Sequence, residues 1–217
     1  MAKEVKPYNK HFNFVSFGVN VLSMSKRIMN EMIYTLEDLG FVPKYSDTDS
    51  FFVEQRALPL LVQEFKRRYG RELIGKALGQ FHCDSPSFGS TDEMPIITRS
   101  IFVFKKCYVC QLLNTSQEIA FVIRLKGVIP DVIVDKANEL FPYDIQCEYR
   151  DGLVYAISST SDNNEYSIYH LYHELYEGKS FEFDLCKSKL KPCFEFENFN
   201  VSTKTTFIRK IGLGEND

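Results

Sequence analysis

Residues 20–53 read NVLSMSKRIMNEMIYTLEDLGFVPKYSDTDSFFV and contain the signals that decide the fold. Apolar side chains recur at helical spacing as far as Leu39, and Gly40 stands where a left-handed glycine ends a helix. The apolar positions are Val21, Leu22, Ile28, Met29, Met32, Ile33, Leu36 and Leu39. This segment therefore predicts an amphipathic helix with one buried face.

A β-hairpin is predicted directly after this helix. Phe41 and Val42 begin one strand, and Phe51 to Val53 return as an apolar run. The acidic hexapeptide YSDTDS, Tyr45 to Ser50, lies between them. The order is therefore helix, strand, acidic turn, strand.

The two aspartates of the hexapeptide, Asp47 and Asp49, are separated by one residue. Residues i and i+2 of a strand point to the same face, so both carboxylates are expected to project together. Like charges at about 4 Å near a surface repel by roughly 4 kcal/mol, and a bound Mg²⁺ reverses that repulsion. A solvated turn is the plainer interpretation, because Asp, Ser and Thr all favour turns.

The helix followed by Tyr-x-Asp-Thr-Asp-Ser resembles motif C of the family B DNA polymerases. The stretch NVLSMSKRIMNEM from Asn20 is similar to the helix before motif C in the protein-primed viral and organellar branch, with its adenoviral, linear-plasmid and polinton-like enzymes. Later segments resemble the same branch in the same order, as far as Ile211. They are LGQFH from Leu78, FKKCY from Phe104, RLKGV from Arg124, LYEGKSFEFDL from Leu175 and TTFIRKI from Thr205.

The resemblance implies a DNA-directed DNA polymerase that transfers nucleotides from dNTPs to a primer 3′-hydroxyl with two Mg²⁺ ions, for which Mn²⁺ is an alternative. Asp49 is implied to be a direct catalytic metal ligand, and Asp47 is implied to support the charge and geometry of the metal site. The remaining turn residues are implied to shape the turn; they are Tyr45, Thr48 and Ser50.

Two further elements are implied to bind the primer and template DNA. Lys106 and Tyr108 match the Lys-x-Tyr motif, and on a strand they would present a cation and a phenol on one face. Lys126 and Gly127 match the Lys-Gly element that follows. An ordinary sheet surface and a plain turn are the alternatives for these residues.

The chain departs from the family upstream of motif C. No segment before residue 45 resembles motif A, which supplies the other metal aspartate, or motif B, which binds the incoming nucleotide. We therefore expect the C-terminal portion of such a polymerase, with part of the palm at 1–127 and a thumb-like region at 128–217. A split subunit, a gene fragment and an incomplete reading frame all fit. A separate chain carrying motifs A and B and a terminal protein primer are the candidate partners.

The expected fold class is α+β, with an antiparallel palm-type sheet, packed helices and a smaller mixed region after it. The 217 residues are 44% hydrophobic, which is enough for one or two ordinary cores. Helices are predicted at 60–69, 130–140 and 164–176, and a loop at 85–93. Strands are predicted at 96–104, 108–113, 119–125, 181–183, 194–196 and 205–208.

The net charge of −3 does not favour nucleic-acid binding by itself, because phosphate binding relies on Lys and Arg. The basic residues are clustered, however, and each cluster is a candidate for contact with phosphate or a solvated face. The clusters are Lys66, Arg67, Arg68 and Arg71; Lys105 and Lys106; and Lys187, Lys189 and Lys191.

Six cysteines without a signal peptide or a membrane-spanning apolar stretch predict free thiols, a soluble protein in a reducing intracellular compartment, and no membrane partner. Cys107 and Cys110 have the spacing of half a zinc site, but on a strand they face opposite sides. His170 and His173 share a helix face with no evident third ligand, so packing or surface roles are expected.

Two other functions are compatible with the acidic turn. The chain alone is expected to bind primer and template without polymerising, because a metal ligand and the fingers are missing. The turn also resembles the DxD of a nucleotide-sugar glycosyltransferase. That alternative requires a nucleotide-binding βαβ region before the turn, and the first forty residues have no such pattern.

Overall fold

The protein divides into two compact units, residues 1–84 and 85–217. The structure, a computed structural model, describes residues 15–89, 94–157, 165–189 and 203–211, and it leaves out the side chains of Val15, 185–189 and 203–211. The predicted boundary at 127 lies inside the second unit, where one sheet contains strands from both sides of Gly127. The assignment of palm and thumb regions stays a prediction.

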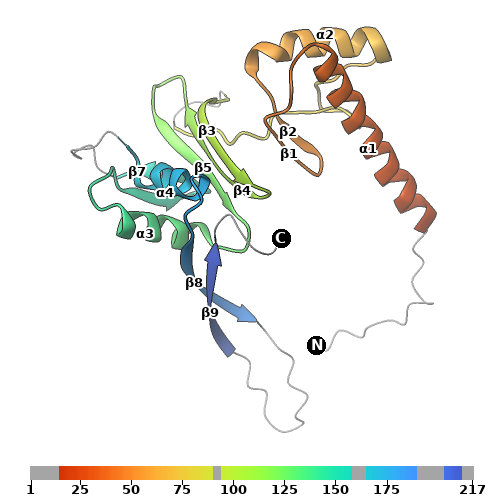
Figure 1. Cartoon of the computed structure of the whole chain (residues 1–217). Coiled ribbons are helices and arrows are strands. Elements are labelled where there is room, and N and C mark those ends of the chain that lie inside the picture. Colours follow the sequence, from red (N-terminus) through yellow and green to blue (C-terminus); the bar gives the residue numbers. More distant parts are fainter. Residues whose placement is uncertain (1–14, 90–93, 158–164, 190–202, 212–217) are drawn as a thin grey trace, which may run out of the picture. The chain divides into compact units, whose positions relative to one another are not determined.

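The first unit is a helical layer that holds a short hairpin (Figure 1). Helix α1 (Val15–Asp38) is followed by β1 (Tyr45–Asp47), β2 (Ser50–Phe52), a 3-10 turn η2 (Gln55–Ala57) and α2 (Leu58–Tyr69). Its core consists of Met32, Leu36, Ala57, Leu61, Phe65 and Leu73. The predicted helix, hairpin and following helix are therefore present in order. The predicted buried face of α1 is too long, however, because Val21 and Leu22 are 53% and 72% exposed and only the C-terminal half of the helix enters the core.

Helix α1 ends at Gly40 as the sequence predicts. Gly40 has a φ of +80°, its N–H donates to Glu37 O at 2.9 Å, and the Phe41 N–H donates to Leu36 O at 3.1 Å. This pair of bonds is a Schellman motif, which requires the left-handed conformation that glycine adopts without steric cost.

The first strand of the hairpin begins later than predicted. Phe41 and Val42 are not in a strand; β1 starts at Tyr45, and the Lys44 N–H donates to Phe52 O at 2.8 Å. Phe41 packs against the core of the unit instead. Pro43 offers no backbone donor, which explains why regular pairing starts only beyond it.

The second unit contains a five-stranded antiparallel sheet in the order β3-β4-β5-β7-β6, so the α+β class is confirmed. The strands are β3 (Ile96–Phe104), β4 (Cys107–Leu113), β5 (Ile119–Leu125), β6 (Cys147–Arg150) and β7 (Leu153–Ala156). Sequence analysis did not predict β6 and β7. Their signal is the Asp151-Gly152 pair, whose φ angles of +53° and +89° suit a two-residue hairpin turn.

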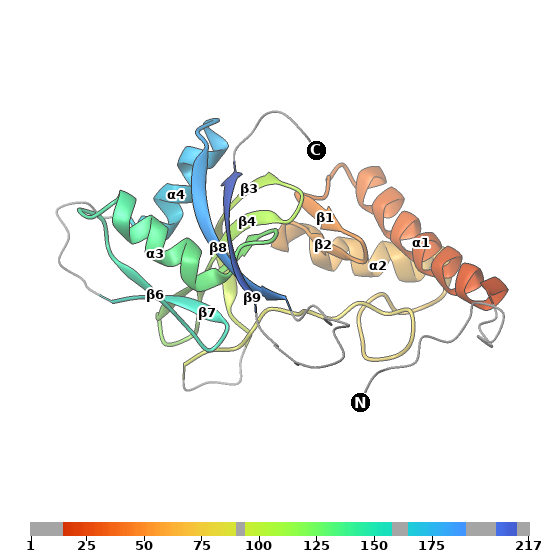
Figure 2. The ribbon, with the colours of Figure 1, turned by 90° about the horizontal axis from the view of Figure 1, so that it is seen from below.

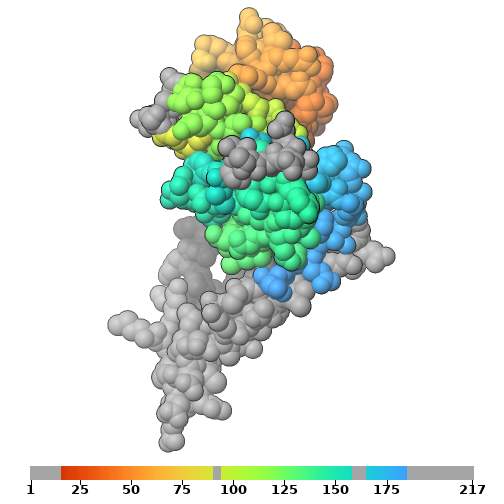
Figure 3. Space-filling model, turned by 90° about the vertical axis from the view of Figure 1, so that its left-hand side faces the viewer, coloured from red at the N-terminus to blue at the C-terminus, as the bar shows by residue number. Residues whose placement is uncertain are grey.

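Helices α3 (Pro130–Leu140) and α4 (Ser167–Tyr176) pack side by side over one face of this sheet (Figure 2). The buried core between helices and sheet includes Val109, Phe121, Ile133, Leu171 and Tyr172. The space-filling view shows α3 with α4 beside it as a continuous outer surface (Figure 3). The α4 prediction began three residues early, at 164.

A two-stranded ribbon of β8 (Phe181–Lys189) and β9 (Thr203–Ile211) follows α4. Phe183 belongs to the core under the helices, so the start of β8 is anchored there. The predicted strands 181–183 and 205–208 lie within β8 and β9, and the predicted strand 194–196 lies outside the described residues.

Candidate active site

The DTD sequence forms the tip of the β1–β2 hairpin. Asp47 pairs with Ser50 in the antiparallel register, so Thr48 and Asp49 alone make the turn. The Asp49 N–H donates to Asp47 O at 2.7 Å, and Thr48 between them has a φ of +56°. A hydrogen bond from the N–H of residue i+2 to the carbonyl of residue i defines a γ-turn. The form in which the central residue has a positive φ is rare and strained.

The two aspartates occupy different positions in this turn. Asp47 ends β1 and is half-buried, whereas Asp49 lies in the turn and is exposed. The prediction that both project from one strand face is wrong, because the i, i+2 rule applies only within a strand. Thr48 Oγ1 donates to Asp47 Oδ1 at 3.1 Å and Ser50 Oγ donates to Asp47 O at 3.0 Å, so both hydroxyls bind Asp47.

The hairpin is attached to the first unit by one of its two faces. Phe51 packs against the core, and its ring centroid lies 5.9 Å from that of Phe81. Tyr45 and Phe52 are cross-strand partners with an edge-on ring contact at 5.9 Å. The register partner of Phe51 is Ser46, which lies between Tyr45 and Asp47 on β1. Because side chains alternate along a strand, Tyr45 and Asp47 lie on the face of the hairpin opposite Ser46 and Phe51.

The turn offers two carboxylates to a cation. Among the described residues, no group of three or more His, Cys, Asp and Glu side chains is arranged to hold a metal ion. Two carboxylates nevertheless fit Mg²⁺, which commonly takes one or two of them together with substrate phosphates rather than a complete protein cage. Asp47 and Asp49 are therefore the candidate metal-binding residues.

The Lys-x-Tyr element has a different geometry from the one predicted. Lys106 lies in the turn between β3 and β4 with a φ of +61°, and only Tyr108 lies on a strand. Phe104 at the end of β3 pairs with Cys107 at the start of β4, so the chain reverses through Lys105 and Lys106. Tyr108 is half-buried, and its ring centroid lies 5.8 Å from that of Phe102.

The Lys-x-Tyr and Lys-Gly elements meet at one end of the sheet although they are far apart in the sequence. The Lys126 N–H donates to Lys106 O at 3.0 Å. Gly127 follows with a φ of +83°, and the Val128 N–H closes the turn on Leu125 O at 3.0 Å. The fold therefore joins Lys106, Tyr108, Lys126 and Gly127 in one region of the second unit.

Sequence analysis missed one residue of this region. Arg124 is the register partner of Tyr108 on β5 and is exposed. The available signal was that Arg124 is the one charged side chain in the otherwise apolar run 119–125.

The basic cluster on α2 is neutralised by carboxylates within the first unit. Arg67 and Arg68 bind Glu64 at 2.6 Å, and Arg68 also pairs with Asp38. Hydrogen bonds from Arg67 and then Arg68 lower the pKa of the Glu64 carboxyl to about 2. The other members pair likewise, Lys66 with Glu72 and Arg71 with Glu31. These pairs favour a solvated face; the side chains of Lys187, Lys189 and Lys191 lie outside those described.

The cysteine pair of β4 does not form half a zinc site. Cys107 and Cys110 are buried free thiols on opposite faces of the strand. Burial raises the pKa of Cys107 to about 12 and that of Cys110 to about 11, which disfavours the thiolate that zinc needs. Cys147 is a third buried free thiol, and Cys83 is an exposed one.

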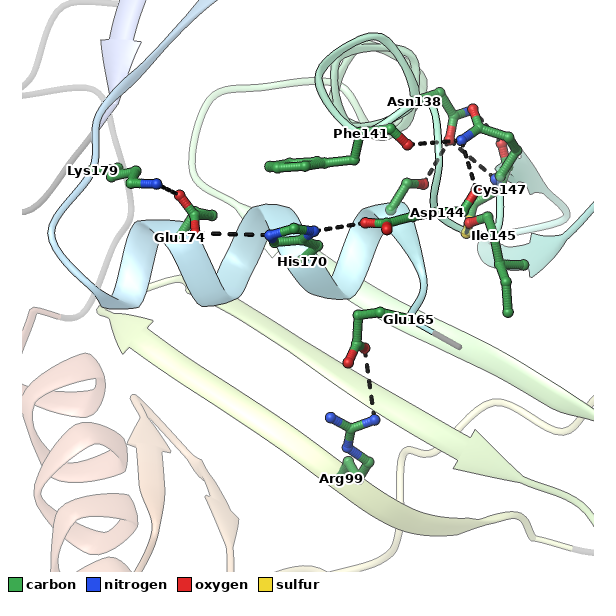
Figure 4. Close-up of polar contacts among 12 residues, drawn as sticks. Arg99, Asn138, Phe141, Asp144, Ile145, Cys147, Glu165, His170, Glu174 and Lys179 are labelled. Atoms are coloured by element: carbon green, nitrogen blue, oxygen red, sulfur yellow. Dashed lines mark hydrogen bonds and ion pairs between the residues drawn. The ribbon is translucent and has the colours of Figure 1, made fainter. Parts of the chain in front are cut away.

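The two histidines of α4 have separate environments, as shown for His170 in Figure 4. His170 Nδ1 lies 2.6 Å from Asp144 Oδ2, and its ring stacks on Phe141 with centroids 3.9 Å apart. His173 is exposed. His170 thus ties α4 to the segment after α3, which agrees with a packing role.

Comparison with known proteins finds no matching family model, no matching curated protein and no matching solved structure. Within the described part of the chain, no helix is both long and apolar enough to cross a bilayer.

Proposed function

We propose that this chain is the C-terminal portion of a protein-primed family B DNA polymerase, with part of the palm at 1–127 and a thumb-like region at 128–217. The observation that carries the proposal is the DTD turn, which places two carboxylates at the tip of a hairpin behind a long amphipathic helix. The order of helix and acidic hairpin is the one that the sequence resemblance implies.

In the proposed reaction, a primer 3′-hydroxyl attacks the α-phosphorus of a dNTP opposite a template base. Asp49 is the direct metal ligand, and Asp47 adds charge and holds the turn through Thr48 and Ser50. Two Mg²⁺ ions, when bound, stabilise the attacking oxygen and the leaving pyrophosphate. Tyr45 supports the strand that ends in Asp47.

The second aspartate of a two-metal site and the fingers are proposed to come from a companion segment with motifs A and B. The exposed start of α1 supports such a companion. Phe17, Val21 and Met24 recur at helical spacing, continue the stripe of the buried Met32, and are 70%, 53% and 56% exposed. Large apolar side chains in a row usually mark a surface that another polypeptide covers.

The proposed role of the chain by itself is binding of primer and template without polymerisation. The joined Lys-x-Tyr and Lys-Gly elements support it, because the backbones of Lys106 and Lys126 meet at the end of the sheet where the half-buried Tyr108 lies.

Metal binding by the turn tests the proposal directly. Mn²⁺ would be titrated into the full chain with a dNTP present, and free Mn²⁺ followed by electron paramagnetic resonance. Asp49→Asn and Asp47→Asn should each weaken binding by about tenfold, equivalent to about 1.4 kcal/mol. Asp131→Asn on α3, an exposed aspartate in the other unit, is the matched control and should bind as wild type.

Activity gives the second readout. In an enzyme completed by a companion with motifs A and B, Asp49→Asn should abolish primer extension while Asp131→Asn leaves it intact. Primer extension at the wild-type rate by Asp49→Asn, or equal Mn²⁺ affinity of that variant and the wild type, would contradict the assignment of the turn.

A further inference from the structure

We propose that Arg124 is an additional phosphate-binding residue, and that it forms a strand-binding row with Tyr108 and Phe102. The row lies on the face of the second unit's sheet opposite α3 and α4. Its ligand is the sugar-phosphate backbone of a DNA strand, read without base specificity. This inference rests on the proposed function, because it extends the DNA-binding role assigned to Lys106 and Tyr108.

The strand register defines the row. Phe102 on β3 pairs with Tyr108 on β4, and Tyr108 pairs with Arg124 on β5. Directly paired residues project from the same face of a sheet. The residues next to Tyr108 and Arg124 in the sequence belong to the core with α3 and α4; they are Cys107, Val109, Ile123 and Leu125. Because side chains alternate along a strand, the row projects from the opposite face of the sheet.

The row combines an aromatic surface with a cation. The Phe102 and Tyr108 rings lie 5.8 Å apart at an interplanar angle of 52°, and Arg124 is exposed beside them. Aromatic rings stack on bases or sugars of a single strand, while the planar guanidinium binds phosphate oxygens in pairs. Lys105, Lys106 and Lys126 at the same end of the sheet add positive charge.

The remaining part of this face is closed to such a ligand. Phe88 packs there against Leu112, Ala120 and Leu153, and its ring lies 6.3 Å from that of Tyr155. A DNA strand bound to this face of the sheet is therefore confined to the end where Phe102, Tyr108 and Arg124 lie.

Arg124 differs from the other arginines of the sheet in its electrostatic surroundings. Arg99 pairs with Glu165 at 3.7 Å (Figure 4). Arg99 also lies over the Tyr169 ring, and Arg150 lies near Glu148 and Asp151. No ion pair between described residues involves Arg124. Within the described part of the chain, no carboxylate therefore offsets its charge, which suits it to bind a phosphate.

The backbone of Arg124 is fixed from the helical side. Tyr172 is completely buried in α4, and its hydroxyl donates to Arg124 O at 2.9 Å. This bond holds the end of β5 in place, so Arg124 and Tyr108 keep their relative position before a ligand binds. Preorganisation of this kind reduces the ordering cost of binding.

The test measures binding of the full chain to a fluorescent primer–template duplex with a single-stranded overhang, by anisotropy over a salt series. Arg124→Ala should weaken binding by about tenfold and reduce the slope of log K against log salt by about one, uniformly across sequences. Arg124→Lys should retain most of the slope, because it keeps the charge. Thermal unfolding of each variant would verify that it is folded.

Arg67→Ala is the matched control, since Arg67 is an equally charged side chain, 69% exposed, that pairs with Glu64. It should bind DNA as the wild type does. If the wild type shows no salt-dependent binding, both this inference and the proposed DNA-binding function are overturned. If the wild type binds and Lys106→Ala weakens it while folded Arg124→Ala does not, only the role of Arg124 is overturned.

Discussion

The N–H of Asp49 donates a hydrogen bond of 2.7 Å to the carbonyl oxygen of Asp47, across a Thr48 whose φ is +56°. A β-branched residue rarely adopts a positive φ, and such a conformation costs about 1 to 3 kcal/mol. The strain lies between the two carboxylates that are the candidate metal ligands. The strained residue at the tip of the hairpin therefore belongs to the proposed metal site.

Thr48→Gly should raise the free energy of unfolding by about 1 kcal/mol, because glycine adopts a positive φ without a Cβ clash. Thr48→Ala keeps the Cβ and is the control, so it should bring no such gain. Urea denaturation of both variants measures the difference. A Thr48→Gly variant less stable than Thr48→Ala would show that the turn is not strained at this residue.

Glu31 should stabilise the first unit through two arginines. Its side chain is only 12% exposed, binds Arg27 Nε at 2.7 Å and also pairs with Arg71, which stacks over Phe65. Glu31→Gln removes the charge between two cations and should lower the free energy of unfolding by about 1 to 3 kcal/mol. Glu37→Gln, an exposed change on the same helix, should stay within about 0.5 kcal/mol of wild type.

The measurement is urea denaturation at low and high salt. The Glu31 effect should persist at high salt, since a partly buried pair is screened less than an exposed one. Equal stability of the Glu31→Gln and Glu37→Gln variants would mean that the pair contributes nothing to this unit.

Asn138 should hold three elements of the second unit together (Figure 4). Its Oδ1 accepts from the Cys147 N–H at 3.1 Å and from Ser167 Oγ at 2.6 Å, and its Nδ2 donates to Cys147 O at 2.7 Å. Asn138→Ala leaves these partners unsatisfied and should cost about 2 to 3 kcal/mol.

Asp135→Ala, at an exposed position of the same helix, is the control for Asn138→Ala. It should change the free energy of unfolding by at most about 0.5 kcal/mol. Hydrogen exchange of the Cys147 amide gives an independent readout: exchange as slow in Asn138→Ala as in the wild type would count against the proposed link.

The buried thiols of β4 should make the protein less stable in alkali. The pKa of Cys107 is raised to about 12 and that of Cys110 to about 11, from an ordinary value of 9.0, because both are buried. Above pH 9 the unfolded chain loses these protons while the folded chain keeps them. The free energy of unfolding should then fall with rising pH up to those raised pKa values, by at most about 1.4 kcal/mol per pH unit for each thiol.

Denaturation at pH 8, 9 and 10 would measure this slope, with Cys107→Ala as the comparison. The variant should be less stable at pH 8 but should lose less stability between pH 9 and 10, because it has one thiol fewer to titrate. Identical slopes for the variant and the wild type would rule out a contribution from Cys107.

Local signals predicted those elements whose geometry depends on neighbouring residues. Gly40 caps the C-terminal end of α1 as expected, and the apolar run of 119–125 predicted β5 with its bounds. The pair Asp151-Gly152 was an equally local signal for the β6–β7 hairpin, but the flanking strands are only four residues each. Strands this short give too little alternation to be recognised without the turn.

The candidate sites depended on features that spacing does not reveal. Lys106 and Tyr108 are one residue apart in the sequence, yet Lys106 lies in the turn between the paired residues Phe104 and Cys107. Glu64 lies three and four residues before Arg67 and Arg68, a helical spacing that the sequence shows, but Asp38 reaches Arg68 only through the packing of α1 against α2. A carboxylate partner thirty residues away along the chain leaves no periodic trace.

The sequence by itself determined the helix, the acidic turn and most strands, because hydrophobic periodicity, glycine and the turn residues act over a few positions. Only the tertiary structure decided that Lys106 and Lys126 meet, that Arg124 pairs with Tyr108, and that Asp38 and Glu31 neutralise Arg68 and Arg71. These relationships arise from strand pairing and side-chain packing between distant segments. Burial and charge compensation are set by those contacts, and composition does not encode them.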